Sequence, residues 1–250
     1  MKAIILAAGK GKRLNSEITH IPKAMRTALG RPLIEYVLDT IGFIDINDIV
    51  IVVGFEKDQI INSLPDYSFA VQSEQLGTGH AALCAKDFFA DYDGDILVIA
   101  GDTPLILRST AEKLLEFHQE NNNACTVLSC MGEKGLSLGR IMRDKNGNLS
   151  EIVENRDCTS EQLEICEYNT ATYIFKSKLL FPALEKIMRN NQKHEVYLTD
   201  VPAVLLNEGE KVGAVTCEHE FEIFGVNTEA DLYRVEGVLK SRLSTNSYKN

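Results

Sequence analysis

The first fourteen residues constrain this chain more than any other segment. An apolar run over residues 3–8 is followed directly by the sequence GKGKR, which contains Gly9, Gly11 and Arg13. Glycine-rich backbone and positive charge after a strand are what a site needs to surround a triphosphate. A Walker loop is excluded because Arg13 stands where it requires Ser or Thr, and a dinucleotide fingerprint because Leu14 replaces its third glycine. The segment therefore predicts a different kind of phosphate-binding loop.

Composition limits the kinds of partner. The chain has 250 residues, 44% of them hydrophobic, and a formal net charge of −10. Such a chain can bury a substantial core, and its negative charge argues against nucleic-acid binding, which needs a basic surface. It contains no apolar run of about 18 residues and no signal-peptide pattern, so we expect a cytoplasmic protein without membrane association. The sequence leaves a monomer and a small homo-oligomer both open.

Six cysteines raise the question of metal binding or disulfide bonding. They lie at positions 84, 125, 130, 158, 166 and 217, and no two of them form a CxxC pair. A structural zinc site is therefore not expected. Since several of them lie in apolar runs, we expect small, reduced residues of the core.

Short apolar runs alternate with amphipathic stretches, which is typical of an α/β domain with a mostly parallel sheet. The run 95–100 is apolar throughout its interior, which favours a central strand buried on both faces. Two alternating segments around Asn146-Gly147 predict a hairpin. The expected strands are 3–8, 48–53, 69–72, 95–100, 124–130, 167–175, 211–217 and 221–226, and the expected helices are 32–41, 57–64, 79–89, 110–121, 179–190, 197–208 and 228–243.

This order of elements predicts one domain over residues 1–243. We expect a Rossmann-like, mixed and mostly parallel central sheet flanked by helices. A β-rich lobe, built from residue 139 to about residue 157, is expected to be inserted after the central strand. Residues 244–250 are polar and are expected to form a C-terminal tail. No internal repeat and no linker rich in Pro, Gly or Ser divides the chain.

A second polar segment, QSEQLGTGHA, begins at the end of the strand expected at 69–72. Gln72 and Gln75 bracket the strand end, and glycines such as Gly77 let a ligand approach the backbone closely. A glutamine amide both donates and accepts hydrogen bonds, which suits the imide edge of a pyrimidine base. A plain strand-to-helix turn with Thr78 as the helix N-cap explains the same residues equally well.

Asp102 directly follows the strand expected at 95–100, at the carboxyl end where α/β sheets place their ligands. Its carboxylate is suited either to capping the next turn or to holding Mg²⁺ against nucleotide phosphates. Magnesium uses only one or two protein ligands, and Asn227 is the second candidate. The start of the terminal helix is an equally simple explanation for Asn227.

Taken together, these motifs resemble those of the sugar-nucleotide pyrophosphorylases, whose first loop reads roughly LAAGxGxRL and is followed by PK. Here the sequence LAAGKGKRL is followed by Pro22-Lys23. The second segment matches the pattern QxEQLGTGHA of one branch, the N-acetylglucosamine-1-phosphate uridylyltransferases, without a substitution. The resemblance covers residues 1 to about 235 and implies the fold of the nucleotide-diphospho-sugar transferases.

The resemblance implies roles for individual residues. Arg13 would neutralise the leaving β- and γ-phosphates, and Lys23 the α-phosphate and the sugar phosphate, with Mg²⁺ held by Asp102 and Asn227. The stretch 197–200 also matches a family motif, but its apolar residues favour a structural role. Nucleotide contacts are implied for Leu6, Ala8, Gly9, Gly11, Gln72, Gln75, Gly77 and Thr78, and sugar contacts for Gly139, Glu154 and Asn169.

Four positions depart from the family pattern, namely Lys12, Arg26, Ala100 and Ala171. Ala100 stands where an aromatic residue is often found and Ala171 where glycine is common, and both belong to segments of the sugar pocket. They therefore bear on the choice of sugar. The chain also lacks the hexapeptide repeats that form the acetyltransferase domain of many relatives, so no acetyltransferase activity is expected from it.

The implied reaction is attack of N-acetylglucosamine 1-phosphate on the α-phosphate of UTP, which gives UDP-N-acetylglucosamine and pyrophosphate. A phosphate monoester with a second pKa of about 6 is mostly dianionic at neutral pH and needs no general base. Positioning and charge neutralisation, with Mg²⁺, therefore suffice. Two alternatives stay open: a nucleotidyltransferase of the UDP-glucose or dTDP-glucose type, and a nucleotide-sugar sensor without turnover.

Overall fold

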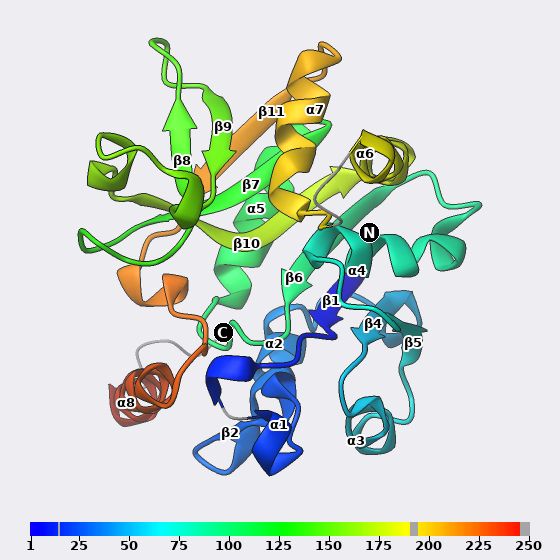
Figure 1. Ribbon diagram of the computed structural model, residues 1–250, viewed down its shortest axis with the longest axis vertical. Coiled ribbons are helices and arrows are strands. Elements are labelled where there is room, and N and C mark those ends of the chain that lie inside the picture. The colour runs from blue at the N-terminus through cyan, green and yellow to red at the C-terminus, as the bar shows by residue number, and fades with distance from the viewer. Residues whose placement is uncertain (15, 191–194, 246–250) are drawn as a thin grey trace.

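The computed structural model describes residues 1–14, 16–190 and 195–245, and a large β-sheet runs through its centre (Figure 1). Two further short strands, β2 (Thr27–Ala28) and β3 (Arg31–Pro32), pair only with each other. The strands of the large sheet are β1 (Lys2–Ala7), β4 (Ile49–Val53), β5 (Ser68–Val71), β6 (Asp95–Ala100), β7 (Cys125–Met131), β8 (Arg140–Arg143), β9 (Leu149–Val153), β10 (Glu167–Lys176) and β11 (Val212–Thr216).

The large sheet is mixed, as expected from the sequence. Its strand order is β11-β7-β10-β6-β1-β4-β5, with β8 and β9 attached beside β10. The pairs β1–β4, β1–β6, β4–β5 and β7–β11 run parallel, whereas β10 runs antiparallel to both of its neighbours, β6 and β7. The predicted α/β class, with a mixed and mostly parallel central sheet, is confirmed.

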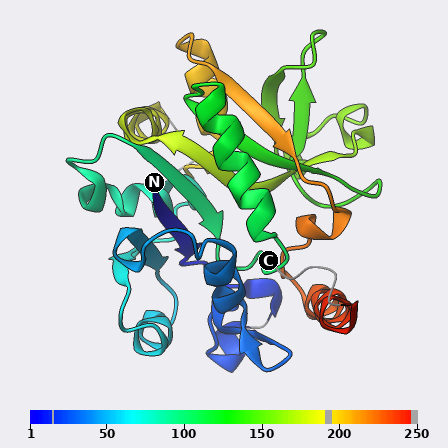
Figure 2. The same cartoon turned by 180° about the vertical axis from the view of Figure 1, so that it is seen from behind.

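Helices cover both faces of this sheet. They are α1 (Ser16–Thr19), α2 (Leu33–Thr40), α3 (Lys57–Ser63), α4 (Thr78–Cys84), α5 (Arg108–Glu120), α6 (Ser177–Asn190), α7 (Val201–Asn207) and α8 (Glu229–Thr245). Apolar side chains of α4, α6 and α7 pack on one face, and those of α2 and α5 on the other, where α5 crosses the sheet in Figure 2. None of the helices among the described residues has both the length and the hydrophobicity to cross a bilayer.

The strand β6 lies in the middle of the sheet, between β1 and β10. The four side chains from Ile96 to Ile99 have no exposed surface, which confirms the prediction of a central strand buried on both faces. The register pairs Leu6 with Ala100 and Ala7 with Val53. The carboxyl ends of β1, β4 and β6 therefore meet at one edge, and the loops that follow them emerge together.

The predicted hairpin around Asn146-Gly147 is confirmed as β8–β9. The Asp144 carboxylate accepts hydrogen bonds from the backbone N–H groups of Asn146 and Asn148, and Gly147 has a φ of 83°, which favours glycine. The hairpin joins the main sheet where Arg140 pairs with Tyr168 of β10. In the expected tail, α8 reaches Thr245, while residues 246–250 lie outside the described part of the chain.

The strand expected at 221–226 is wrong, because the 3-10 helix Glu220–Ile223 lies there instead. The Glu222 side chain is buried, and its carboxylate accepts a hydrogen bond of 3.0 Å from the backbone N–H of Leu107, just before α5. An acidic residue that caps the start of another helix does not follow the strand pattern.

The expectation that all the cysteines are reduced is also wrong. Cys130, in β7, and Cys217, after β11, form a disulfide with a Cα–Cα distance of 5.0 Å. They are 87 residues apart in the sequence, and the parallel pairing of β7 with β11 brings them together. Cys125 is buried in the core, as expected.

Candidate functional site

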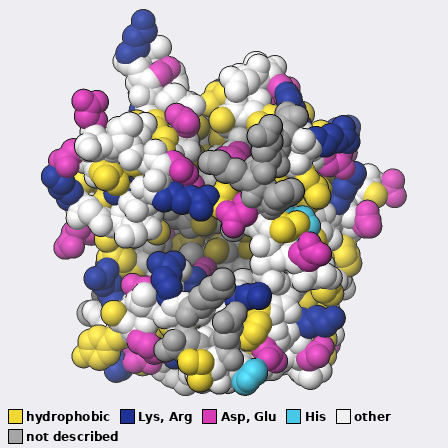
Figure 3. All heavy atoms as spheres, viewed as in Figure 1, with side chains coloured by type: hydrophobic (Ala, Val, Ile, Leu, Met, Phe, Trp, Pro, Cys, Tyr) yellow, Lys and Arg dark blue, Asp and Glu magenta, His cyan; other side chains and the backbone are white. Residues whose placement is uncertain are grey.

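A cavity of about 490 Å³ opens at the sheet edge where β1 and β6 end. Figure 3 shows the hollow in this face of the molecule, with cationic and acidic side chains around its opening. Gly11 does not line the cavity, but every other residue that the sequence analysis singled out as a site residue does. These are Leu6, Ala8, Gly9, Arg13, Lys23, Gln72, Gln75, Gly77, Thr78, Asp102, Gly139, Glu154, Asn169 and Asn227.

The loop after β1 forms one side of the cavity, and its two glycines, Gly9 and Gly11, have different roles. A Cβ atom on Gly9 would meet no other atom within 4 Å, so the backbone there is open to a ligand. A Cβ atom on Gly11 would lie 2.7 Å from the Ser16 hydroxyl and 3.2 Å from the Lys23 Cβ, and the φ of Gly11 is +59°. Gly11 thus lets the loop pack closely, away from the cavity itself.

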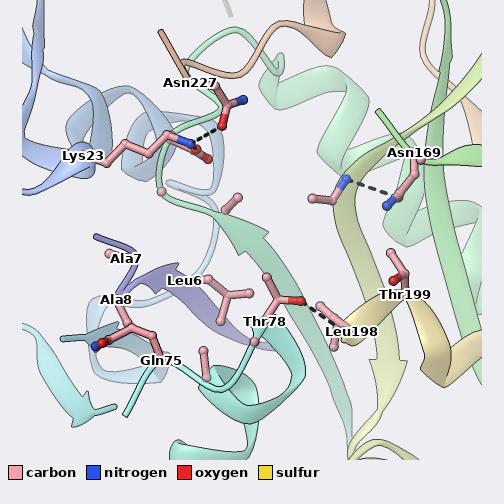
Figure 4. A pocket seen from close by; sticks show the side chains of 18 of the residues that line it. Leu6, Ala7, Ala8, Lys23, Gln75, Thr78, Asn169, Leu198, Thr199 and Asn227 are labelled. Atoms are coloured by element: carbon pink, nitrogen blue, oxygen red, sulfur yellow. Dashed lines mark hydrogen bonds and ion pairs between the residues drawn. The ribbon is translucent and has the colours of Figure 1, made fainter. Parts of the chain in front are cut away.

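Lys23, Asp102 and Asn227 converge from three distant parts of the chain. The Lys23 ammonium forms an ion pair with the Asp102 carboxylate and donates a hydrogen bond of 2.8 Å to Asn227 Oδ1. The Arg13 guanidinium donates to the same Oδ1 atom at 3.0 Å. Figure 4 shows Lys23 and Asn227 pointing toward each other at one end of the cavity.

A backbone hydrogen bond holds the two oxygen-bearing residues of this cluster together. The N–H of Val226 donates to the carbonyl of Asp102 at 2.9 Å. Because Asn227 follows Val226 directly, its side chain is fixed beside Asp102. One carboxylate and one amide oxygen therefore both contact the Lys23 ammonium, and hard oxygen ligands of this kind suit Mg²⁺.

Gln72 is buried at the start of the second glycine-rich segment, and its amide orientation is fixed. Its Nε2 atom donates to the Gly77 carbonyl at 3.0 Å and lies 3.0 Å from His80 Nδ1, which accepts the second proton. An amide turned the other way would set its oxygen against the Gly77 carbonyl. Its Oε1 atom has no partner among the described residues, so Gln72 offers the cavity an acceptor.

Gly77 lies where the second segment meets the chain before α7. It has a φ of +102°, and a Cβ atom there would lie 2.3 Å from the Val196 carbonyl, so no other residue fits. The same carbonyl accepts a hydrogen bond of 2.8 Å from the N–H of Gly79. The Thr78 hydroxyl accepts one of 3.1 Å from the N–H of Leu198 (Figure 4). These bonds hold the segment from Val196 onward against α4.

The opposite side of the cavity is built from paired side chains of the β-rich lobe and of the segment before α7. The Thr199 hydroxyl donates to the Glu154 carboxylate at 3.0 Å, and Asn169 Nδ2 donates to the Tyr173 hydroxyl at 2.7 Å. The Gly139 carbonyl accepts from the N–H of Asn169 at 2.9 Å. Asn169 and Thr199 thus lie across the cavity from Lys23 and Asn227 (Figure 4).

Acidic groups lie close together on this side. Burial and the negative charge of Glu154 raise the pKa of Asp200, which follows Thr199. Burial, more than any other factor, raises the pKa of the Tyr173 phenol far above its ordinary value. The phenol therefore keeps its proton at all physiological pH values.

Four polar residues of the cavity wall, Ser137, Tyr173, Glu195 and Thr199, were not predicted as site residues from the sequence. Thr199 belongs to the stretch 197–200, and the interpretation of that stretch as structural is incomplete. Leu198 is buried, as a structural residue would be, but Leu198 and Thr199 also line the cavity. Tyr173 has the sequence surroundings of an ordinary core residue of a strand, which do not reveal that it lines the cavity and contacts Asn169.

Residues 2–221 match the family described as "Nucleotidyl transferase". The bifunctional protein GlmU of Clostridium beijerinckii is 40% identical over 250 residues, which cover 99% of this chain and 54% of that protein. The bifunctional protein GlmU of Bacillus cytotoxicus is 40% identical over 249 residues, with the same shares. The chain thus spans about half the length of these relatives.

A solved structure from Bacillus anthracis, described as a glucose-1-phosphate thymidylyltransferase in complex with sucrose, is similar in fold. It superposes with a TM-score of 0.75 over 95% of this chain and 94% of that chain. Sequence identity between the two is 21%, so the likeness concerns the fold alone.

Proposed function

The chain belongs to the nucleotidyl transferase family, and we propose that it makes UDP-N-acetylglucosamine and pyrophosphate from UTP and N-acetylglucosamine 1-phosphate. One observation carries the proposal. A single cavity joins a cluster of cations and metal-type oxygens at one end to paired polar side chains on the opposite side. The bifunctional GlmU relatives, about 40% identical over nearly the whole chain, support this choice among nucleotidyltransferases.

The end of the cavity with Lys23 and Arg13 suits the triphosphate. Both cations point at Asn227 Oδ1, and both would turn to phosphate oxygens once a nucleotide enters. The sugar phosphate oxygen would form a bond to the α-phosphorus, and the bond from that phosphorus to the β-phosphate oxygen would break. Lys23 would hold the α-phosphate, and Arg13 would neutralise the departing pyrophosphate.

Asp102 and Asn227 are the residues that would hold Mg²⁺. They fit the ion because their oxygens lie close enough together for both to contact the Lys23 ammonium. Magnesium uses only one or two protein ligands and takes the others from phosphates and water. When bound, Mg²⁺ would neutralise charge on the phosphate oxygens.

Base selection would rest on Gln72. Its Oε1 atom is an acceptor, which matches the N3–H of uracil, whereas N3 of cytosine carries no proton. CTP would therefore leave a buried acceptor unpaired, at a cost of about 1–3 kcal/mol. Thymine presents the same imide edge, and Gln72 does not read the methyl group. dTTP is therefore the nearest competitor of UTP.

A matrix of nucleotides and sugar phosphates tests the proposal. UTP, dTTP, CTP, ATP and GTP would each be combined with N-acetylglucosamine 1-phosphate and glucose 1-phosphate in the presence of Mg²⁺, and pyrophosphate release measured. We expect the fastest turnover with UTP and N-acetylglucosamine 1-phosphate, and a rate about 10-fold to 100-fold lower with CTP. Equal rates with ATP and UTP would contradict the assignment of the base. A faster reaction with glucose 1-phosphate than with N-acetylglucosamine 1-phosphate would contradict the assignment of the sugar. Binding without turnover would indicate a sensor.

A further inference from the structure

Tyr173 and Asn169 lie four residues apart on β10, and both line the cavity. A bulge between Asn169 and Thr172 interrupts the pairing of β10 with β7 and allows the two side chains to meet. Asn169 Nδ2 donates to the Tyr173 hydroxyl at 2.7 Å. Tyr173 is only 1% exposed, so its hydroxyl cannot rely on bulk water for a partner.

The direction of this hydrogen bond is fixed by Ala171. The backbone N–H of Ala171 donates to Asn169 Oδ1 at 3.2 Å. Ala171 lies in the bulge, and its φ of 58° is in the left-handed region. A flipped amide would set two N–H groups against each other, so Nδ2 must face Tyr173. The Tyr173 oxygen therefore accepts, and its own proton needs a different acceptor.

No acceptor for this proton is found among the described residues. Tyr173 makes a single hydrogen bond there, the one from Asn169. Its ring is stacked on Phe175 with the ring centroids 5.5 Å apart, so packing keeps the ring in place. A buried hydroxyl without an acceptor is unfavourable, and a ligand in the cavity that supplies an oxygen atom would satisfy it.

We propose that the Tyr173 hydroxyl donates this proton in a hydrogen bond to the acyl carbonyl oxygen of an N-acylated hexosamine 1-phosphate. This assignment rests on the proposed function, and it makes Tyr173 a residue that selects the sugar. An N-acyl group presents one N–H donor and one carbonyl acceptor. The same side of the cavity offers the Glu154 carboxylate as an acceptor and Tyr173 as a donor, so the two groups complement an amide. A sugar with a plain hydroxyl at that carbon has no carbonyl oxygen for Tyr173.

The test compares two sugars in Tyr173→Phe, at saturating UTP. We expect kcat/KM for N-acetylglucosamine 1-phosphate to fall about 5-fold to 20-fold, with less than about a 2-fold change for glucose 1-phosphate and an unchanged KM for UTP. Tyr168→Phe is the matched control. Tyr168 is a fully buried tyrosine of the same strand that does not line the cavity, and its hydroxyl donates to the Glu133 carbonyl at 2.7 Å. It should leave the ratio between the two sugars unchanged.

A second measurement uses the unchanged protein and so does not depend on how the variant folds. Replacing the acetyl oxygen of the sugar phosphate by sulfur weakens the acceptor. The N-thioacetyl analogue should therefore show a kcat/KM several-fold below that of the acetyl compound. Equal values for the two compounds would overturn the assignment.

Each outcome of the Tyr173→Phe experiment is decisive. Equal losses with both sugars, or no loss with either, would overturn the carbonyl contact while the wild-type protein still turns over UTP and N-acetylglucosamine 1-phosphate. If the wild-type protein does not catalyse that reaction at all, the proposed function fails, and the role of Tyr173 falls with it.

Discussion

The two sides of the cavity are built in different ways. Most of the nucleotide wall follows the carboxyl ends of parallel strands. It consists of residues 6–9, Arg13, Lys23, Gln72, Gln75, Gly77, Thr78, Asp102 and Asn227. The sugar wall consists of Gly139, Glu154, Asn169, Tyr173 and Thr199, from the antiparallel part of the sheet and the segment before α7.

The nucleotide wall relies on backbone shape and charge. Gly77 cannot be replaced without a clash with Val196, and Lys23 is held between Asp102 and Asn227. The sugar wall relies on pairs of neutral and acidic side chains that hold each other, as Thr199 holds Glu154. We therefore expect substitutions in the nucleotide wall to damage the chemical step, and those in the sugar wall to damage mainly the binding of one substrate.

The largest effect is expected for Asp102→Ala. The change removes the carboxylate that pairs with Lys23 and would bind Mg²⁺, so kcat should fall about 10²-fold to 10³-fold while the protein stays folded. Pyrophosphate release measures turnover, and a thermal melt checks folding. Asp66→Ala, at an exposed position outside the cavity, is the control. If the Asp102→Ala protein is folded and keeps most of its turnover, the proposed role of charge in the nucleotide wall is contradicted.

A smaller and more selective effect is expected for Thr199→Val. The substitution keeps the shape of the side chain but removes the hydroxyl that donates to Glu154. We expect KM for the sugar phosphate to rise about 5-fold, with kcat and the KM for UTP nearly unchanged. Thr110→Val, at a buried position of α5 outside the cavity, is the matched control. A rise in both KM values would show that the two walls are not separate.

The smallest effect concerns stability in acid. Burial by itself would raise the pKa of Glu167, but hydrogen bonds from Arg143 and Ser129 outweigh it and hold the pKa below its ordinary value of 4.5. Glu167 joins β10 to β8 through Arg143 and to β7 through Ser129, so it supports the strand that carries Asn169.

A carboxylate with a lowered pKa stabilises the fold above its unfolded pKa, and this contribution is lost as the pH falls through the folded value. In Glu167→Gln the contribution is absent at every pH. The wild-type Tm at pH 7 should therefore exceed that of the variant by about 2–4 °C, the shift expected from roughly 1 kcal/mol in a chain of this size. The gap should shrink below about pH 4. A gap that stays constant down to pH 3 would contradict the role of the ionised carboxylate.

Much of the nucleotide wall could be predicted from the sequence because its signals are local. Three of its features can each be recognised within about ten residues: the apolar run that precedes Gly9, the segment around Gly77, and Asp102 after a buried strand. The structure gathers them because parallel strands align their carboxyl ends at one edge. Their roles in binding remain predictions.

The sugar wall was harder to predict because its contacts span long stretches of sequence. The Thr199 hydroxyl and the Glu154 carboxylate that it contacts are 45 residues apart in the sequence. Tyr173 reaches Asn169 through a bulge in which Ala171 has a left-handed φ, and a periodic pattern reveals neither feature. The wrong strand at 221–226 has the same origin, since Glu222 is buried against the distant Leu107. The pairing of Cys130 with Cys217 likewise depends on which strands become neighbours.

The central claim is that the two walls recognise the two substrates independently, and a double-mutant cycle tests it most directly. Gln72→Met removes the amide of the nucleotide wall, Thr199→Val removes the hydroxyl of the sugar wall, and kcat/KM is measured for both variants and for their combination. The account predicts that the two losses add in free energy to within about 0.5 kcal/mol. A coupling energy above about 1 kcal/mol would contradict it.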